Sequence, residues 1–163
     1  MTVFKLATPD VVITTLTPTS ENLLKSYPHK QARERATNPL NYVVEVNREE
    51  LTRALSRLVL TSSITENKKF KDIGYITFTD GAITITDFKK INREVINCTS
   101  CGVEKPVQLC MELPVLKSIA ETCVEDGLSI SFGNNISITI TRGNIINVVT
   151  AVVPQNDEEE VSE

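Results

Sequence analysis

The cysteines are the residues of this chain whose type and spacing first suggest chemistry. Cys98 and Cys101 form a C-x-x-C pair, and Cys110 and Cys123 follow farther along the chain. A structural zinc site usually needs a second close pair of ligands, which the separation of Cys110 from Cys123 does not provide. A thioredoxin-like redox motif is also disfavoured, because no helical pattern follows Cys101. We therefore interpret the cysteines as reduced thiols that act as small apolar side chains, and we expect no metal and no cofactor.

Residues that suit acid, base or nucleophilic catalysis are sparse. We interpret the single histidine, His29, as an exposed linker residue, because no partner motif lies near it. The chain has no glycine-rich phosphate loop and no Ser-His-Asp set. Asp80, Asp87 and Asp126 lie in or beside predicted turns, where aspartate is common for backbone reasons. The sequence therefore predicts a protein that is not an enzyme.

Arg53 and Arg57 lie one turn apart in the strongest helical pattern of the chain, residues 47–60. Apolar residues recur in this stretch at helical spacing and predict one buried stripe: Leu51, Ala54, Leu55, Leu58 and Val59. Asn47 suits the N-cap of the helix, and Glu50 suits the answering position of a capping box. From the pattern alone, the two arginines serve only to keep the exposed face of the helix soluble.

The elements around this helix occur twice in the same order. The first set has strands at residues 43–46, 75–78, 83–86 and 93–98, with the helix after the first strand. The second set has strands at residues 107–111, 128–132, 136–140 and 145–153, with a helix at residues 113–124 after the first strand. This is an internal repeat of a βαβββ unit. Two such units that share sheets predict an α+β domain with both helices on one face.

The whole chain then divides into four parts. Residues 1–17 predict a hairpin that must pack on another domain or chain, because a lone hairpin is marginally stable in water. Residues 18–41 have the composition of a connector, and residues 42–154 form the complete repeated domain. Residues 155–163 predict an acidic, disordered tail.

Charge and hydropathy limit the classes of partner. The net charge of −4 argues against attraction of the whole surface to nucleic acid, but it allows a local basic face. The apolar runs are far shorter than a membrane span, and the N-terminus lacks the order of a signal peptide. We therefore expect a cytoplasmic protein with no membrane partner.

Four stretches resemble, in order and register, the third domain of the bacterial DNA polymerase III beta subunit, the DNA sliding clamp. They read VEVNREELTRALSRLVLTSS, YITFTDGAITIT, LCMELPVLKSIAE and ISITITRGNIINVVTAVVP. The earlier segments VVITTLTPT and YPHKQARERATNP are similar to the end of the second domain of that family and to its interdomain connector. The resemblance runs from about Val3 to Pro154 and implies the DNA-clamp fold. In that family six such domains close around duplex DNA, with helices lining the hole and sheets forming the outer wall.

The resemblance implies a processivity factor that tethers the replicative polymerase, in the nucleoid of a bacterial or phage-infected cell. Arg53 and Arg57, together with Lys117 on the second helix, would then face the DNA through water. Scattered cations attract phosphates without reading the base sequence, and a sparse set leaves the ring free to slide.

Clamps of this family also have a hydrophobic pocket that receives short peptides from polymerases, clamp loaders and repair proteins. By register, its positions here are Pro28, Ala32, Arg33, Val152, Val153 and Pro154. Apolar walls with a few polar groups at the rim suit such peptides. Two departures affect the choice of partner: the family has a basic residue about where Ala32 stands, and Gln155 with an acidic run replaces its methionine-rich end. The alternative for Val152 and Val153 is ordinary strand burial.

The family chain has three domains, whereas this sequence resembles one complete domain and the last hairpin of another. We therefore expect a ring in which another copy of the chain, or a companion polypeptide, supplies the missing domains. A split-gene product, a fragment and a small clamp-like protein are all compatible with the sequence. The alternative function is a clamp-like interaction module or regulator that binds clamp partners without encircling DNA.

Overall fold

The computed structural model describes residues 2–7, 12–17, 40–62, 72–133, 136–142 and 145–152, together with Lys30, Glu34 and Thr37. The chain forms two compact units, Met1–Glu34 and Arg35–Glu163. In the first unit, β1 (Thr2–Ala7) and β2 (Val12–Thr17) pair as an antiparallel hairpin, with Thr2 opposite Thr17. The predicted hairpin at the start of the chain is therefore present.

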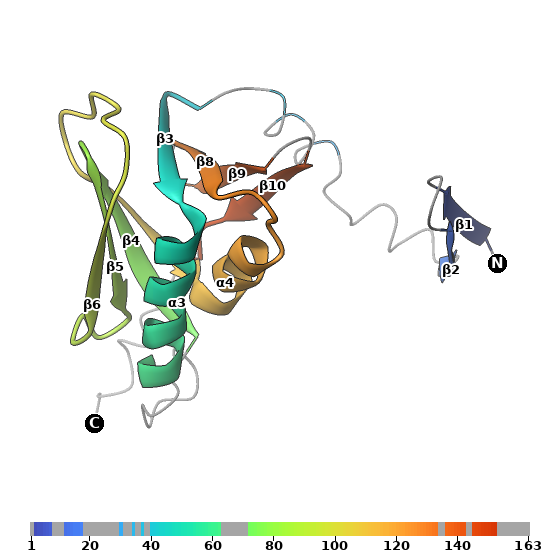
Figure 1. Cartoon of the computed structure of the whole chain (residues 1–163), viewed down its shortest axis with the longest axis horizontal. Helices are drawn as coiled ribbons and strands as arrows, with labels where there is room; N and C mark the ends of the chain where they lie inside the picture. The colour runs from blue at the N-terminus through green and yellow to red at the C-terminus, as the bar shows by residue number, and fades with distance from the viewer. Residues whose placement is uncertain are drawn as a thin grey trace, which may run out of the picture. The chain divides into compact units, whose positions relative to one another are not determined.

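The second unit contains the two predicted βαβββ sets (Figure 1). The first set consists of β3 (Tyr42–Asn47), α3 (Arg48–Ser62), β4 (Ile73–Thr79), β5 (Ala82–Asp87) and β6 (Arg93–Asn97). The second set consists of β7 (Val107–Glu112), α4 (Leu113–Glu121), β8 (Gly127–Phe132), β9 (Ser137–Arg142) and β10 (Ile145–Thr150). The internal repeat is therefore confirmed.

Each repeat gives its first strand to the sheet of the other repeat. The first sheet has the order β6-β5-β4-β7, and the second sheet has the order β10-β9-β8-β3. All neighbouring strands in both sheets are antiparallel. The helices α3 and α4 pack against each other in front of the two sheets (Figure 1). The α+β fold, with shared sheets and both helices on one face, is confirmed.

The two helices begin in the same way. The backbone N–H of Arg48 donates to the carbonyl of Asp126, which directly precedes β8, at 2.9 Å. The backbone N–H of Leu113 donates to the carbonyl of Asp72, which directly precedes β4, at 2.9 Å. Each bond satisfies one of the N–H groups that the first turn of a helix leaves without an internal partner. Each helix therefore begins beside the residue that leads into the second strand of the other repeat, and α3 and α4 run antiparallel (Figure 1).

The core is built from alternate residues of the strands and one stripe of each helix. In β4 and β8 every second residue is buried, and the last of these are Phe78 and Phe132. Their rings stack at a centroid distance of 4.1 Å and join the two sheets. The stripe predicted for α3 is confirmed at Leu51, Ala54, Leu55 and Leu58, which are buried, and Val59 packs against them.

Three elements end earlier than the sequence pattern predicts. The helix α4 ends at Glu121 and not at residue 124: the N–H of Cys123 donates to Ala120, and Val124 is 94% exposed. The strand β6 ends at Asn97, because Cys98 pairs with Val46 of β3. The strand β10 ends at Thr150, because the chain turns toward β7 and Val152 donates its N–H to Cys110 at 2.8 Å. For β6 and β10 a contact distant in sequence ends the local pattern, whereas α4 ends in a local turn.

We expect Gly74→Ala to destabilise the second unit by about 1–3 kcal/mol, because a methyl group has no space at this buried position of β4. A Cβ there would lie 2.3 Å from the carbonyl oxygen of Thr86 and 2.8 Å from Leu113 Cδ1. Urea unfolding followed by circular dichroism measures the change. Gly127→Ala is the matched control, because a Cβ there meets nothing within 4 Å. Equal stability of the two variants would contradict the expected clash.

Candidate nucleic-acid interface

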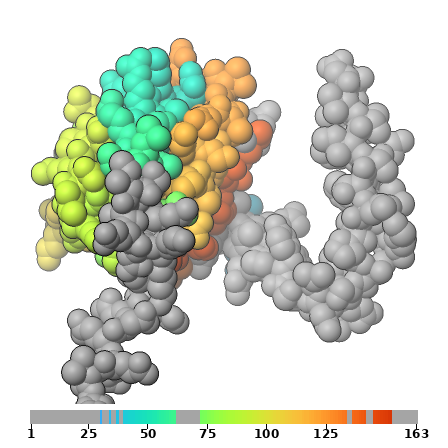
Figure 2. Space-filling view, turned by 90° about the horizontal axis from the view of Figure 1, so that it is seen from below, coloured from blue at the N-terminus to red at the C-terminus, as the bar shows by residue number. Residues whose placement is uncertain are grey.

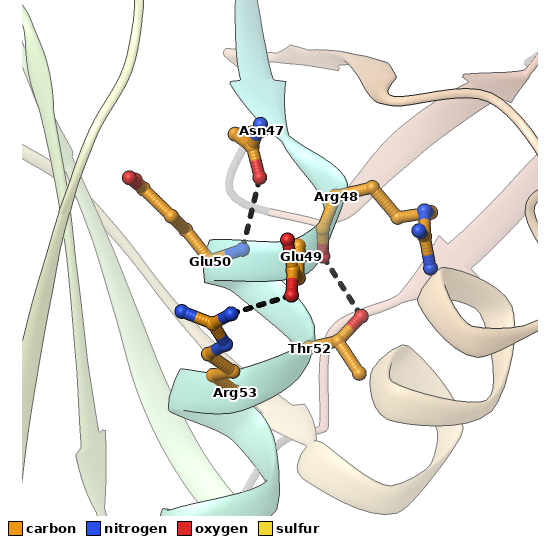
Figure 3. Close-up of polar contacts among 6 residues, drawn as sticks. All are labelled: Asn47, Arg48, Glu49, Glu50, Thr52 and Arg53. Atoms are coloured by element: carbon orange, nitrogen blue, oxygen red, sulfur yellow. Dashed lines mark hydrogen bonds and ion pairs between the residues drawn. The ribbon is translucent and has the colours of Figure 1, made fainter.

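The start of α3 is fixed by Asn47. Its side-chain Oδ1 accepts a hydrogen bond from the N–H of Glu50 at 3.1 Å (Figure 3), which confirms the predicted N-cap. The Glu50 carboxylate extends away from Asn47 in Figure 3, and no described contact returns from it to the Asn47 backbone. The predicted capping box is therefore only half formed. The single cap bond still fixes the first turn of α3, and thereby the side of the helix from which Arg53 and Arg57 project.

Arg53 lies on the exposed side of α3. Its Nη2 atom forms an ion pair with Glu49 Oε1 at 2.5 Å, one turn earlier on the same helix (Figure 3). The side chains are 64% and 63% exposed, so water competes with the pair. Exposed i, i+4 pairs of this kind contribute about 0.3–0.5 kcal/mol. Arg53 is therefore available to another anion.

The contact of Arg57 has a more defined geometry than the pair between Arg53 and Glu49. Its Nε and Nη2 atoms donate to the two carboxylate oxygens of Glu94 on β6, each at 2.7 Å. These bonds raise the pKa of Arg57 above its usual value. The two parallel bonds hold the guanidinium in one orientation and attach α3 to the edge of the first sheet.

Lys117 is the candidate cation of the second helix. Its Nζ atom lies 3.4 Å from Glu121 Oε1, one turn later on α4, and its side chain is 31% exposed. Each of the three predicted DNA-facing cations, Arg53, Arg57 and Lys117, therefore lies beside a carboxylate. Because such surface pairs are weak, this arrangement lowers the local positive potential without preventing an exchange for phosphate.

Arg48 is a further cation near the helix face that the sequence pattern did not indicate. It is the first residue of α3, and its side chain extends from the helix toward α4 (Figure 3). Its Nε atom is buried without a hydrogen-bond partner, and no ion pair joins it to any described residue. A cation at this place is unfavourable for the N-terminus of α3 but favourable for the C-terminal end of the antiparallel α4. Arg48 could not be predicted as part of this face from the sequence, because its place depends on the antiparallel packing of α3 and α4.

The two helices present one continuous face. In Figure 2 the surfaces of α3 and α4 lie side by side, between the strands of the two sheets. This face is not wholly polar, because Leu60 on α3 is 69% exposed and Val115 on α4 is 41% exposed. Arg53, Arg57 and Lys117 are thus carried by two packed helices whose relative position is fixed by the core.

Most of the predicted peptide pocket lies outside the described residues: Pro28, Ala32, Arg33, Val153 and Pro154. Val152 is described, is half-buried, and lies beside β7 through the bond from its N–H to the Cys110 carbonyl. The pocket stays a prediction.

The cysteines are free thiols. Cys110 and Cys123 are buried, and Cys98 and Cys101 are half-buried. Burial raises the pKa of Cys98 and of Cys110, which disfavours the reactive thiolate. Among the described residues no group of three or more His, Cys, Asp or Glu is placed to hold a metal, and no helix is long and apolar enough to cross a membrane.

Solved structures of bacterial sliding clamps have the same fold. A DNA polymerase sliding clamp from Pseudomonas aeruginosa with a ligand superposes with a TM-score of 0.66 at 12% identity, over 93% of this chain. A DnaN sliding clamp from Bartonella birtlesii bound to griselimycin gives 0.65 at 16% identity, over 92% of this chain. The DNA polymerase III subunit beta from Pseudomonas aeruginosa gives 0.67 at 13% identity, also over 92%. No family model and no curated protein sequence matches the chain.

These likenesses define the class of fold. The chain has the sliding-clamp fold, as the sequence resemblance predicted. It spans 40%, 39% and 39% of the lengths of the three clamps. At 12–16% identity the likeness concerns the fold and does not transfer an activity.

We expect Asn47→Ala to destabilise the second unit by about 1 kcal/mol, because the first turn of α3 loses its cap. Urea unfolding measures the loss. Glu50→Ala serves as the control and should change stability by less than about 0.5 kcal/mol, since the carboxylate makes no described bond to the cap. A larger loss from Glu50→Ala than from Asn47→Ala would show that the capping box forms in full.

Proposed function

We propose that this chain is a non-enzymatic part of a DNA sliding clamp that helps to encircle duplex DNA and to tether the replicative polymerase. The observation that carries the proposal is the doubled βαβββ unit with exchanged first strands and paired helices, in the fold shared with bacterial clamps. A ring needs rigid, curved segments, and the exchange of strands makes this unit rigid. In this proposal the clamp stays on DNA because it encircles the duplex, and no described residue is given a catalytic role.

The helix face supplies a weak attraction for phosphate. Arg53, Arg57 and Lys117 are the cations proposed to face the DNA, and Arg48 joins them at the start of α3. Phosphate contacts give affinity without sequence preference. Because carboxylates accompany three of these cations, the attraction is small, which suits a ring that must move along the duplex.

Ring closure requires the edges of the sheets. The first sheet ends at β6 and the second at β10, and both edges expose apolar side chains: Ile91 and Val95 near β6, and Ile145 and Ile146 on β10. An exposed edge strand is a ready site for pairing with another chain. We propose that a companion polypeptide or another copy of this chain pairs there and supplies the remaining domains.

The proposed peptide pocket accepts segments of the polymerase and of the clamp loader. Its residues are Pro28, Ala32, Arg33, Val152, Val153 and Pro154. Apolar anchors from a short peptide would enter such a groove. Val152 supports the idea, because its backbone bond to Cys110 ties this part of the chain to β7.

A second candidate function is an interaction module that binds clamp partners without encircling DNA. The pairing of Arg53, Arg57 and Lys117 with carboxylates favours it, because such a face attracts DNA weakly. Retention on circular duplex DNA, with loss when the circle is cut, separates encirclement from simple peptide binding.

Replacing Arg53, Arg57 and Lys117 together by glutamine is expected to weaken binding to duplex DNA. Each phosphate contact that is lost should lower the slope of log affinity against log salt concentration by about 0.9. Fluorescence anisotropy of a labelled duplex at several salt concentrations measures the slope, and circular dichroism checks the fold.

The control for this experiment removes the same charge elsewhere. Lys89→Gln, Lys90→Gln and Arg93→Gln together neutralise the turn between β5 and β6 and the start of β6, and should leave the slope unchanged. Equal losses in the two triple variants would contradict a DNA site on the helices.

Glu94→Gln is expected to strengthen DNA binding by about two- to fivefold at low salt, because it releases the Arg57 guanidinium from an anionic partner. The same anisotropy titration measures the gain, which should disappear in the Arg57→Gln background. A gain that persists without Arg57 would contradict the release of Arg57 as its cause and assign it to the lost charge of Glu94 itself.

A further inference from the structure

The exposed edge of β6 is a second surface feature, separate from the helix face. The strand β6 is the last strand of the first sheet, and among the described residues β3 meets it only at its far end, through Cys98 and Thr99. No other described strand pairs with the rest of that edge, so its backbone groups offer a site for pairing. Ile91 and Val95, which flank the open part, are 72% and 53% exposed. The edge therefore combines free backbone groups with apolar side chains.

The β6 edge is also basic. Lys89, Lys90 and Arg93 are exposed, and none of them forms an ion pair with a described residue. Lys90 lies over the ring of Tyr75, with its Nζ atom 4.6 Å from the ring centroid.

Asp87, the carboxylate at the start of this turn, does not offset these cations at the surface, and Glu94, which follows Arg93, is paired with Arg57. Asp87 is only 4% exposed, and its oxygens accept hydrogen bonds from the N–H of Ile91 and from the N–H and side chain of Asn92, at 2.8, 3.1 and 2.6 Å. These bonds fix the turn between β5 and β6. The turn therefore holds three cations at the start of an open strand.

A straight path across the outer face of the first sheet leads to this edge. The N–H of Val152 donates to the carbonyl of Cys110 on β7. In the strand register Cys110 lies opposite Tyr75, Tyr75 opposite Thr86, and Thr86 opposite Arg93. The described chain thus ends beside one end of a row of residues whose other end is Arg93.

We propose that the chain after Val152 crosses the first sheet along this row and that its acidic end, within residues 157–163, pairs with the β6 edge as an added strand. The segment carries Asp157, Glu158, Glu159, Glu160, Val161 and Glu163. Four strand spacings separate Val152 from β6, which is about 19 Å at about 4.8 Å each. About six extended residues cover that distance, so the chain reaches β6 near residue 158, where the run of glutamates lies.

Charge and backbone pairing both favour the acidic segment, and not the β6 strand of a second copy of the chain, as the partner of the β6 edge. Two copies of β6 placed edge to edge would bring Lys89, Lys90 and Arg93 close to their own counterparts, and like charges oppose such pairing. The acidic segment instead brings carboxylates to these cations while its backbone completes the edge. If the proposed clamp function holds, the segment also protects one of the two edges required for ring closure until a partner strand displaces it.

Hydrogen exchange of the full chain against a variant that lacks residues 155–163 tests the proposal. At about 50 mM salt, amides of residues 91–97 should exchange at least about threefold faster in the shortened chain, because an added strand protects them. Amides of β10 serve as the internal control and should not change. At about 0.5 M salt the difference should shrink, because screening weakens the contacts between charges.

Two further variants and one peptide complete the test. Lys89→Gln, Lys90→Gln and Arg93→Gln together in the full chain should reproduce the faster exchange, and a synthetic peptide of residues 155–163 added to the shortened chain should reverse it.

Equal exchange at residues 91–97 with and without the segment would overturn the proposal. Protection of the shortened chain that rises with its concentration, with dimers in light scattering, would assign the edge to a second copy and also overturn it. The titration of the variant that replaces Arg53, Arg57 and Lys117 changes no residue of β6. Failure of this proposal is therefore distinguishable from failure of the clamp function.

Discussion

The stacking of Phe78 on Phe132 is the contact on which the arrangement of the second unit depends. The two rings are 1% and 0% exposed, lie 4.1 Å apart and are inclined by 13°. One belongs to β4 of the first sheet and the other to β8 of the second, so the stack holds two sheets that share no strand. An aromatic pair of this kind contributes about 0.5–1.5 kcal/mol beyond the burial of its surface.

Both rings occupy the same place in their repeats, as the last inward residue of the strand that follows the helix. The equivalence extends to the outer ends of the sheets. Val46 pairs with Cys98 at one junction, and Val152 bonds to Cys110 at the other. Since each repeat lends its first strand to the opposite sheet, neither repeat completes a core alone. The positions of α3 and α4 therefore follow from the whole unit, which keeps their exposed residues in a fixed array.

The sequence predicted those features that depend on local periodicity. The predicted alternation of buried residues in β4 and β5 and the predicted buried stripe of α3 were correct, because each pattern indicates which side of a single element is buried. The pairing of Arg57 with Glu94 was not predictable, because it requires β6 to lie against α3. The early end of α4 was missed for a related reason: Val124 continues an apolar pattern, but no partner covers it and it is exposed. For the proposed site, the sequence places three cations on the two helices, but it did not indicate the pairing of Arg57 with Glu94 or the position of Arg48.

The described contacts rank the cations of the helix face by their availability to an anion in solution. Arg48 has no ion pair with a described residue, and Arg53 and Lys117 have single contacts within their own helices. Arg57 is held by two bonds to Glu94, whose side chain is 23% exposed, and its release costs the most. Under the proposed function, a phosphate approaching the helix face would therefore exchange first with the cations at the start of α3 and on α4. We propose that such a graded set holds DNA through several weak, replaceable contacts, which is the electrostatic condition for a protein that must hold a duplex and still move along it.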